Sequence, residues 1–298
     1  MMPMQTLLIT GGSGFVGKNL TDFFSGQCRV ITTYLTHPDV AACDEALELD
    51  ITDAEQVHSV LRRAKPEVVI HAAGNKDVRF CEDHPDAAYR VNAIGTQNVA
   101  VACRELKAQM IYLSTDLVFE CTRGNYAEDE VPNTDLVYGK SKLEGERLAV
   151  QELNDVAICR SAGIYGPGSP LLNWLERKIA SGQPVEAFVD VFNSPTYSEN
   201  LGEMLDVIAR RRLSGVFHTA GRERVNRLDF FRAYASTFAL DASLISPSSL
   251  RDMGSRLLLQ PDSSLSVQQT AAKLGVVFNS VAEGFERLRS HGGRSAKD

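Results

Sequence analysis

A loop of regularly spaced glycines near the N-terminus constrains the fold of this chain more than any other feature. Gly11, Gly14 and Gly17 recur at every third position, between the apolar residues 7–10 and a helical pattern that starts near Lys18. In a strand-loop-helix unit, glycines at this spacing let the backbone turn tightly and approach a pyrophosphate, which the amides at the helix start can bind. An ordinary tight turn has the same spacing, but this context predicts nucleotide binding.

Short apolar segments alternate with helical patterns through the first half of the chain. Six of them are typical of strands: residues 7–10, 30–34, 46–50, 68–72, 110–115 and 156–161. Thr52 and Glu55 are spaced as a capping box, which predicts a helix that runs to Lys65, and Pro85 lies near the start of a further long helix. This order predicts an α/β fold, a doubly wound parallel Rossmann sheet with a smaller C-terminal substrate-binding lobe.

The pattern changes after Gly166. A Pro/Gly-rich connection is followed by helical patterns near 171–181 and 199–212, and residues 215–220 are again typical of a buried strand. We therefore predict that residues 1–165 form the dinucleotide-binding domain and that about 199–221 return to it. The remainder of 166–298 is expected to form most of the substrate-binding lobe.

Composition narrows the class of protein. The net charge of −7, without long basic runs, argues against a nucleic-acid partner. The six cysteines form no Cys-x-x-Cys pair and have no histidine at ligand spacing, so we predict reduced thiols and no metal site. Because the start lacks a signal-peptide pattern and no apolar run approaches the ~20 residues of a membrane span, a cytoplasmic protein is expected.

Three side chains are candidates for the chemistry. Tyr138 and Lys142 stand four residues apart, so on a helix they share one face, and the ammonium is expected to lower the pKa of the tyrosine toward neutrality. Thr115 ends the predicted strand 110–115, where open α/β sheets bind ligands, and its hydroxyl could orient a substrate carbonyl against Tyr138. The alternatives are an ordinary surface Tyr and Lys, and a threonine that caps the strand end.

The end of the second predicted strand bears on cofactor choice. Proteins that prefer NAD usually carry an acid there, whereas this chain has Tyr34, followed by Thr36 and His37, which could donate to a 2′-phosphate. NADP is therefore favoured modestly over NAD. A shifted register would bring Asp39 to this position and restore the NAD interpretation.

Longer strings carry a family resemblance. Residues 114–119 (Ser-Thr-Asp-Leu-Val-Phe), Glu128, Glu130 and residues 138–146 (Tyr-Gly-Lys-Ser-Lys-Leu-Glu-Gly-Glu) resemble the dTDP-4-dehydrorhamnose reductase family of extended short-chain dehydrogenases. Supporting strings at 71–74, 91–93, 194–197 and 215–221 extend the resemblance to roughly nine-tenths of the chain.

The resemblance implies hydride transfer from a reduced nicotinamide to the C4 keto carbon of a nucleotide-linked 6-deoxy sugar. Tyr138 would protonate the developing alkoxide, Lys142 would hold the nicotinamide ribose, and Thr115 would polarise the carbonyl. Besides Tyr138, Lys142 and the second strand end with Tyr34, Thr36 and His37, the implied cofactor contacts are Gly11, Ser13, Gly14, Phe15, Val16, Gly17, Asp50, Ile51, Ala72, Ala73, Gly74 and Ser114. Asp50 fits a strand-end cap equally well.

Lys76, Asp116, Gly163 and Asn193 are the candidates for substrate contacts. Family members that reduce dehydrorhamnose commonly have a tryptophan where this chain has Gly163, so the particular sugar stays open. The expected partners are a nucleotide sugar and, by analogy with the superfamily, a second copy of the chain.

Two other functions remain open. One is a sugar-nucleotide epimerase or dehydratase on the same fold, although the single acid in Asp116-Leu117 disfavours dehydration. The other is a non-catalytic regulator, because the β subunit of methionine adenosyltransferase also resembles this reductase family.

Overall fold

The chain divides into two compact units in the computed structural model, which describes residues 4–253 and 258–292. The first unit comprises Met1–Glu120, Val131–Ser161 and Gly202–Phe217, and the second comprises Cys121–Glu130, Ala162–Leu201 and His218–Asp298. Residues 121–130 and 162–165 belong to the second unit, whereas the sequence-based division placed them in the first domain. Within the described ranges, none of the helices combines the length and the apolar character that crossing a bilayer requires.

A seven-stranded parallel sheet forms the centre of the first unit, in the order β3-β2-β1-β4-β5-β6-β9. Its strands are β1 (Thr6–Thr10), β2 (Arg29–Tyr34), β3 (Glu45–Glu48), β4 (Val68–His71), β5 (Gln109–Thr115), β6 (Val156–Ser161) and β9 (Gly215–His218). Every residue of β4, β5 and β6 is buried, as expected for strands covered by helices on both faces. The predicted α/β class and parallel sheet are confirmed.

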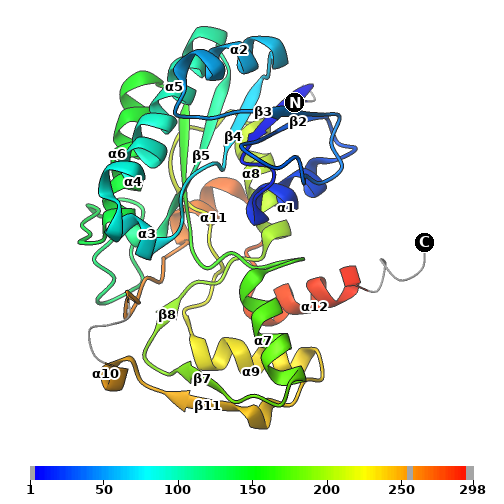
Figure 1. Cartoon of the computed structure of the whole chain (residues 1–298), viewed down its shortest axis with the longest axis vertical. Coiled ribbons are helices and arrows are strands. Elements are labelled where there is room, and N and C mark those ends of the chain that lie inside the picture. The colour runs from blue at the N-terminus through cyan, green and yellow to red at the C-terminus, as the bar shows by residue number, and fades with distance from the viewer. Residues whose placement is uncertain (1–3, 254–257, 293–298) are drawn as a thin grey trace. The chain divides into compact units, whose positions relative to one another are not determined.

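Helices cover both faces of this sheet (Figure 1). On one face α2 (Ala54–Ala64), α5 (Gly95–Leu106) and α6 (Val137–Glu152) lie side by side and bury Val57, Val99 and other apolar side chains against the strands. On the other face lie α1 (Phe15–Phe24) and α8 (Ser198–Arg210). A Cβ on Gly202 would stand 2.5 Å from the ring of Phe23, so glycine lets α8 pack closely against α1.

The start of α2 corrects one prediction. The N-cap is Asp53, whose side chain accepts from the Gln56 amide at 3.0 Å, and Thr52 does not cap this helix. The Thr52 hydroxyl instead donates to Asp50 Oδ1 at 2.8 Å. Aspartate is among the strongest N-caps, and with Thr52 held by Asp50 the helix begins one residue later than the capping box implied.

The long helix expected around Pro85 is divided into shorter pieces. They are α3 (Val78–Asp83), α4 (Pro85–Tyr89) and a π-helical turn η1 (Arg90–Ile94), which leads directly into α5. Pro85 stands in the first turn of α4, where its missing N–H costs nothing.

The second unit has a core of its own. Its elements are α7 (Pro170–Ala180), β7 (Val185–Phe188), β8 (Phe192–Asn193), β10 (Val225–Asn226), α9 (Arg227–Thr237), η3 (Ala242–Leu244), β11 (Ile245–Ser248), α10 (Leu250–Met253), α11 (Gln268–Leu274) and α12 (Val281–Gly292). Two small sheets pair β10 with β8 and β11 with β7. The rings of Tyr165, Phe230 and Phe285 pack with centroids 5.1–5.3 Å apart at the centre of the core.

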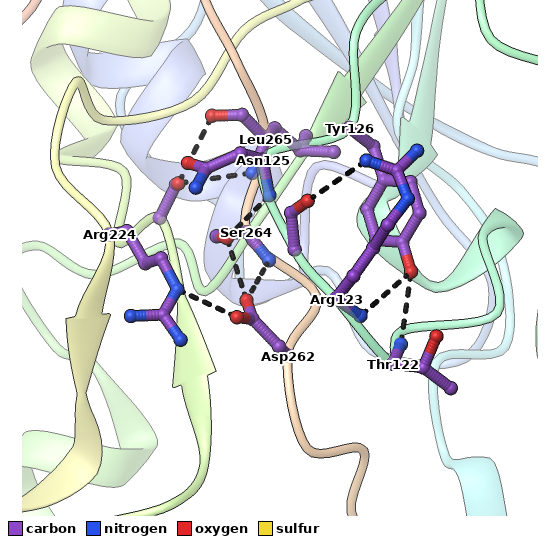
Figure 2. Close-up of polar contacts among 10 residues, drawn as sticks. Thr122, Arg123, Asn125, Tyr126, Arg224, Asp262, Ser264 and Leu265 are labelled. Carbon is purple, nitrogen blue, oxygen red and sulfur yellow. Dashed lines mark hydrogen bonds and ion pairs between the residues drawn. The ribbon is translucent and has the colours of Figure 1, made fainter.

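A polar cluster around Asp262 joins distant segments of this second unit (Figure 2). Asp262 accepts from Arg224 Nε and from the Ser264 hydroxyl, each at 2.6 Å, and the Asn125 amide donates to that hydroxyl at 2.8 Å. A Cβ on Gly124 would lie 2.1 Å from Asp262 Oδ1. These contacts explain why residues 121–130 belong to the second unit.

Candidate active site

The three spaced glycines have different physical roles in the structure. A Cβ on Gly11 would lie 2.8 Å from Ala73 Cα, and one on Gly17 would lie 2.2 Å from the Gly11 carbonyl oxygen. Both positions therefore require glycine for packing alone. Gly14 is exposed, and its Cβ would meet only the Gly11 oxygen, at 3.2 Å. Gly14 is thus the glycine at which a bound group could approach the backbone.

A pocket of about 500 Å³ opens beside this loop, where the strand order reverses between β1 and β4. Gly14 is the N-cap of α1 and has no side chain to occupy the first amides of the helix, which are left to bind an anion. The volume lies within the usual range for a small-ligand site. The donor set and the open glycine both fit a dinucleotide.

Most of the predicted cofactor residues line this pocket. They are Gly11, Ser13, Gly14, Phe15, Val16, Gly17, Tyr34, Asp50, Ile51, Ala72, Ala73 and Gly74, and Lys76, predicted as a substrate contact, lines it as well. Thr36 and His37 are exposed residues of the loop after β2 and are not among the lining residues. The pocket is also lined by residues outside the predicted cofactor contacts, namely Thr33, Leu35, Leu49, Thr52, Asn75, Asp77 and Val91. Most of these residues are sequence neighbours of predicted ones at the same strand ends. That position in the sequence could have indicated that they line the pocket.

Two acids near the pocket have defined partners. The carboxylate of Asp39, a largely exposed residue, lies 2.6 Å from Nζ of Lys18. Lys18 is the residue that directly follows the glycine loop. Asp50 Oδ1 accepts from both the amide and the hydroxyl of Thr52 at 2.8 Å. Asp50 thus caps the end of β3 and lines the pocket, so both of its expected roles are compatible with the structure.

Thr115 and Tyr138 come together at the carboxyl end of β5. Thr115 is the last residue of β5, Tyr138 lies in the first turn of α6, and the Thr115 hydroxyl lies near enough to the Tyr138 phenol to influence its pKa. Burial raises the pKa of Tyr138, the Thr115 hydroxyl lowers it, and the nearby Asp116 carboxylate raises it. The expected fall in the pKa of Tyr138 is therefore wrong for this arrangement, because burial is the largest effect.

Lys142 is buried one helical turn beyond Tyr138. Its ammonium donates to the Leu113 carbonyl at 2.7 Å and lies 4.1 Å from the ring centroid of Tyr112. Burial lowers the pKa of Lys142 from 10.5 to about 7, while the carboxylate of Glu146 raises it. An amine with a pKa near 7 exchanges its proton readily under physiological conditions.

The remaining candidates are distributed over both units. Ser114 lies in β5, and its hydroxyl donates to Glu146 Oε1 at 2.5 Å. Asp116 is buried in the short helix η2 (Asp116–Val118) and accepts from Thr115 at 3.0 Å. Gly163 and Asn193 are neighbours in the second unit, where a Cβ at position 163 would lie 2.5 Å from Asn193 Nδ2.

The structure gives no metal-binding cluster in the part of the chain that it describes, where no three His, Cys, Asp or Glu side chains are grouped suitably. None of the six cysteines, all of which lie in the described residues, forms a disulfide.

Comparison with known families decides the relationship. Residues 4–291 match the model of the RmlD substrate binding domain family, which is almost the whole chain. The chain belongs to the RmlD family. The family resemblance predicted from the sequence motifs is thereby confirmed.

Several relatives of this RmlD-family protein are reductases. It is 28% identical over 277 residues to a dTDP-4-dehydrorhamnose reductase of Mycolicibacterium smegmatis, covering 91% of this chain and 81% of the relative. A crystal structure of the Bacillus anthracis dTDP-4-dehydrorhamnose reductase in complex with NADP superposes with a TM-score of 0.84 at 27% identity. That match covers 97% of this chain and 99% of the other.

A relative of another kind matches nearly as well. The β subunit of methionine adenosyltransferase 2 from Bos taurus is 26% identical over 258 residues, which is 83% of this chain and 76% of the relative.

Proposed function

We propose that this RmlD-family chain is a reductase that transfers hydride from NADPH to the C4 keto group of a nucleotide-linked 6-deoxy sugar. The observation that carries the proposal is the proximity of the Thr115 and Tyr138 side chains at the carboxyl end of β5, with Lys142 buried one turn away. The pocket beside the glycine loop lies in the same unit and suits the dinucleotide.

Each residue of the pair has a defined task. A reduced nicotinamide bound in the pocket would supply the hydride. The Thr115 hydroxyl orients the substrate carbonyl oxygen, and the Tyr138 hydroxyl donates the proton to that oxygen as negative charge develops on it. Because burial raises its pKa, the phenol holds its proton at neutral pH, and a positive charge nearby is needed for it to release that proton to the substrate.

Lys142 supports proton transfer by placing a positive charge one helical turn away from Tyr138. Its ammonium is fixed by the Leu113 carbonyl and by the Tyr112 ring, so the charge has a set position on the helix face that it shares with Tyr138. A positive charge there stabilises the phenolate that remains after Tyr138 gives up its proton.

NADPH is the proposed form of the cofactor. Tyr34, which carries no carboxylate, ends β2 and lines the pocket, so no acid repels a 2′-phosphate at this strand end. The Asp39 carboxylate, which could repel this phosphate, lies 2.6 Å from the ammonium of Lys18, and this positive charge offsets part of the repulsion. The related reductase from Bacillus anthracis, which binds NADP, agrees with this choice.

Oxidation of NADPH and NADH with a panel of nucleotide-linked 4-keto-6-deoxy sugars tests the proposal. We expect turnover with at least one sugar, and Tyr138→Phe should lower kcat by roughly 10²- to 10⁴-fold while the cofactor still binds. Turnover that is unchanged in Tyr138→Phe would refute the assignment. A product formed without net oxidation of the cofactor would indicate an epimerase.

A regulatory function is the second candidate, because the adenosyltransferase β subunit matches this chain almost as well as the reductases do. Stable co-purification of the chain with a methionine adenosyltransferase, together with no turnover of any sugar in the panel, would favour it.

A further inference from the structure

A third buried polar side chain continues the line of Tyr138 and Lys142 along α6. Glu146 follows Lys142 by four residues, so all three side chains share one face of the helix. Only 5% of Glu146 is exposed. The proposed roles of Thr115, Tyr138 and Lys142 do not involve this carboxylate.

Glu146 joins three secondary-structure elements through its two oxygens. Arg160, which is 4% exposed on β6, donates from Nε to Oε1 at 3.1 Å and from Nη2 to Oε2 at 2.7 Å. The Ser114 hydroxyl of β5 donates to Oε1 at 2.5 Å. Ser114 and Arg160 are also partners in the register between β5 and β6. One carboxylate of α6 therefore fixes neighbouring points on two strands.

The contacts of Lys142 and Glu146 follow one another along β5. Lys142 binds the Leu113 carbonyl and Glu146 binds the Ser114 hydroxyl, and the next residue of the strand is Thr115. Two successive turns of α6 thus hold the two residues before Thr115. Since Tyr138 is on the same helix, this double attachment sets the position of Thr115 relative to Tyr138.

The negative charge of Glu146 also counteracts the effect of burial on the pKa of Lys142. From β4, His71 faces the lysine, and its own pKa falls to about 3 through burial and the charge of Lys142, which leaves the imidazole neutral. From β5, the Tyr112 ring lies against the ammonium. On α6 itself, Tyr138 is a neutral phenol at pH 7 and Glu146 raises the pKa of Lys142.

Stability alone explains this arrangement poorly. Buried ion pairs are commonly no more stable than well-packed apolar side chains of similar size. Moreover, Arg160 Nη1 is buried and has no hydrogen-bond partner within the described residues, which adds a desolvation cost. If the Glu146–Arg160 ion pair served only to join β6 to α6, the additional contact of Glu146 with Ser114 of β5 would not be needed.

We propose that Glu146 is a positioning residue for the reaction, anchored by Arg160, which holds the end of β5 against α6 and serves as the counter-charge of Lys142. The proposal rests on the proposed reductase function for its kinetic consequences. Its electrostatic consequence is measurable without turnover.

The first test follows the titration of Lys142 by NMR of ¹³C-labelled lysine side chains, with Lys142→Met identifying the signal. In Glu146→Gln, whose amide keeps the shape but not the charge, we expect the midpoint of Lys142 to fall by about 1 to 2 pH units. Glu144→Gln is the matched control, because Glu144 lies on the same helix but pairs with the exposed Arg147. An unchanged midpoint in folded Glu146→Gln would overturn the proposal.

A kinetic test separates position from charge. In Glu146→Asp the charge stays but its reach shortens, so we expect kcat to fall roughly 10- to 100-fold, with little change in the KM for NADPH and in the Lys142 midpoint. In Glu146→Gln the alkaline limb of the pH–rate profile should move to lower pH. Wild-type kcat in Glu146→Asp would contradict the positioning role.

Loss of Arg160's partner could unfold Glu146→Gln, so a second variant keeps the test decisive. Glu146→Gln/Arg160→Met removes both buried charges at similar volume and is expected to fold. The Lys142 midpoint should fall in it as well, and an unchanged midpoint again overturns the proposal. If the wild type reduces no sugar while the midpoint moves as expected, the reductase function fails and the electrostatic role of Glu146 stands.

Discussion

Replacing Lys142 with methionine is expected to stabilise the fold while it removes activity. The folded protein holds this lysine at 6% exposure, and its pKa falls from 10.5 to about 7. A fall of that size corresponds to about 5 kcal/mol of lost stability when the lysine is charged in both the folded and the unfolded states. Methionine would avoid this cost at similar volume.

The extra stability expected for Lys142→Met depends on pH. Below pH 7 the lysine is protonated in both states, so its cost is present in full. Above pH 7 the folded state sheds its proton while the unfolded state keeps it up to about pH 10.5, so wild-type stability rises with pH relative to the variant. After subtraction of about 1 to 2 kcal/mol for the lost hydrogen bond to Leu113, we expect Lys142→Met to be about 3 kcal/mol more stable at pH 6. The difference should vanish near pH 9.

Urea denaturation of both proteins between pH 6 and pH 9 measures this difference. Lys140→Met is the matched control, because the lysine at 140 is exposed on the same helix and its removal should leave the pH dependence of stability as in the wild type. A difference between Lys142→Met and wild type that stays constant with pH would refute the reasoning. It would mean that folding does not change the proton affinity of this lysine.

Other predictions follow from the glycines and the cofactor pocket. Gly14→Val should fold, because its Cβ meets only one backbone oxygen, yet lose dinucleotide binding in a fluorescence titration; retained affinity would remove the loop from the site. Titration should also show tighter binding of NADPH than of NADH, and the opposite order would restore the NAD interpretation. Gly124→Ala (φ 69°) should cost about 2 kcal/mol or more in urea denaturation, since it collides with Asp262, whereas Gly26→Ala (φ 76°), with open space around it, should cost less.

The first unit could be predicted well because its strands are apolar over several consecutive residues. The segment 156–161 coincides with β6, and the first, second and fifth strands begin within one residue of their predicted starts. The π turn at Arg90–Ile94 could not be predicted from hydrophobic periodicity, because one extra residue in a helical turn does not change the composition of the segment. The break at 121–130 depends on contacts with Asp262, far along the chain.

The geometry of the candidate site could be predicted where residue spacing determines it. The glycine loop and the four-residue step from Tyr138 to Lys142 follow from backbone period alone, and both groups of residues gather as that period requires. Protonation was harder to predict. The pKa of Tyr138 depends on how much surface burial removes, and the sequence names a neighbour such as Lys142 without saying where its ammonium points.

The discontinuity of the first unit has a consequence for how the chain matures on the ribosome. Its edge strand β9 and much of the helix α8 come from Gly202–Phe217, long after β6 has been synthesised. Until those residues emerge, β6 is an open edge with unpaired backbone groups, which invites pairing with a neighbouring nascent chain. Fragments that stop at residue 165 should therefore aggregate.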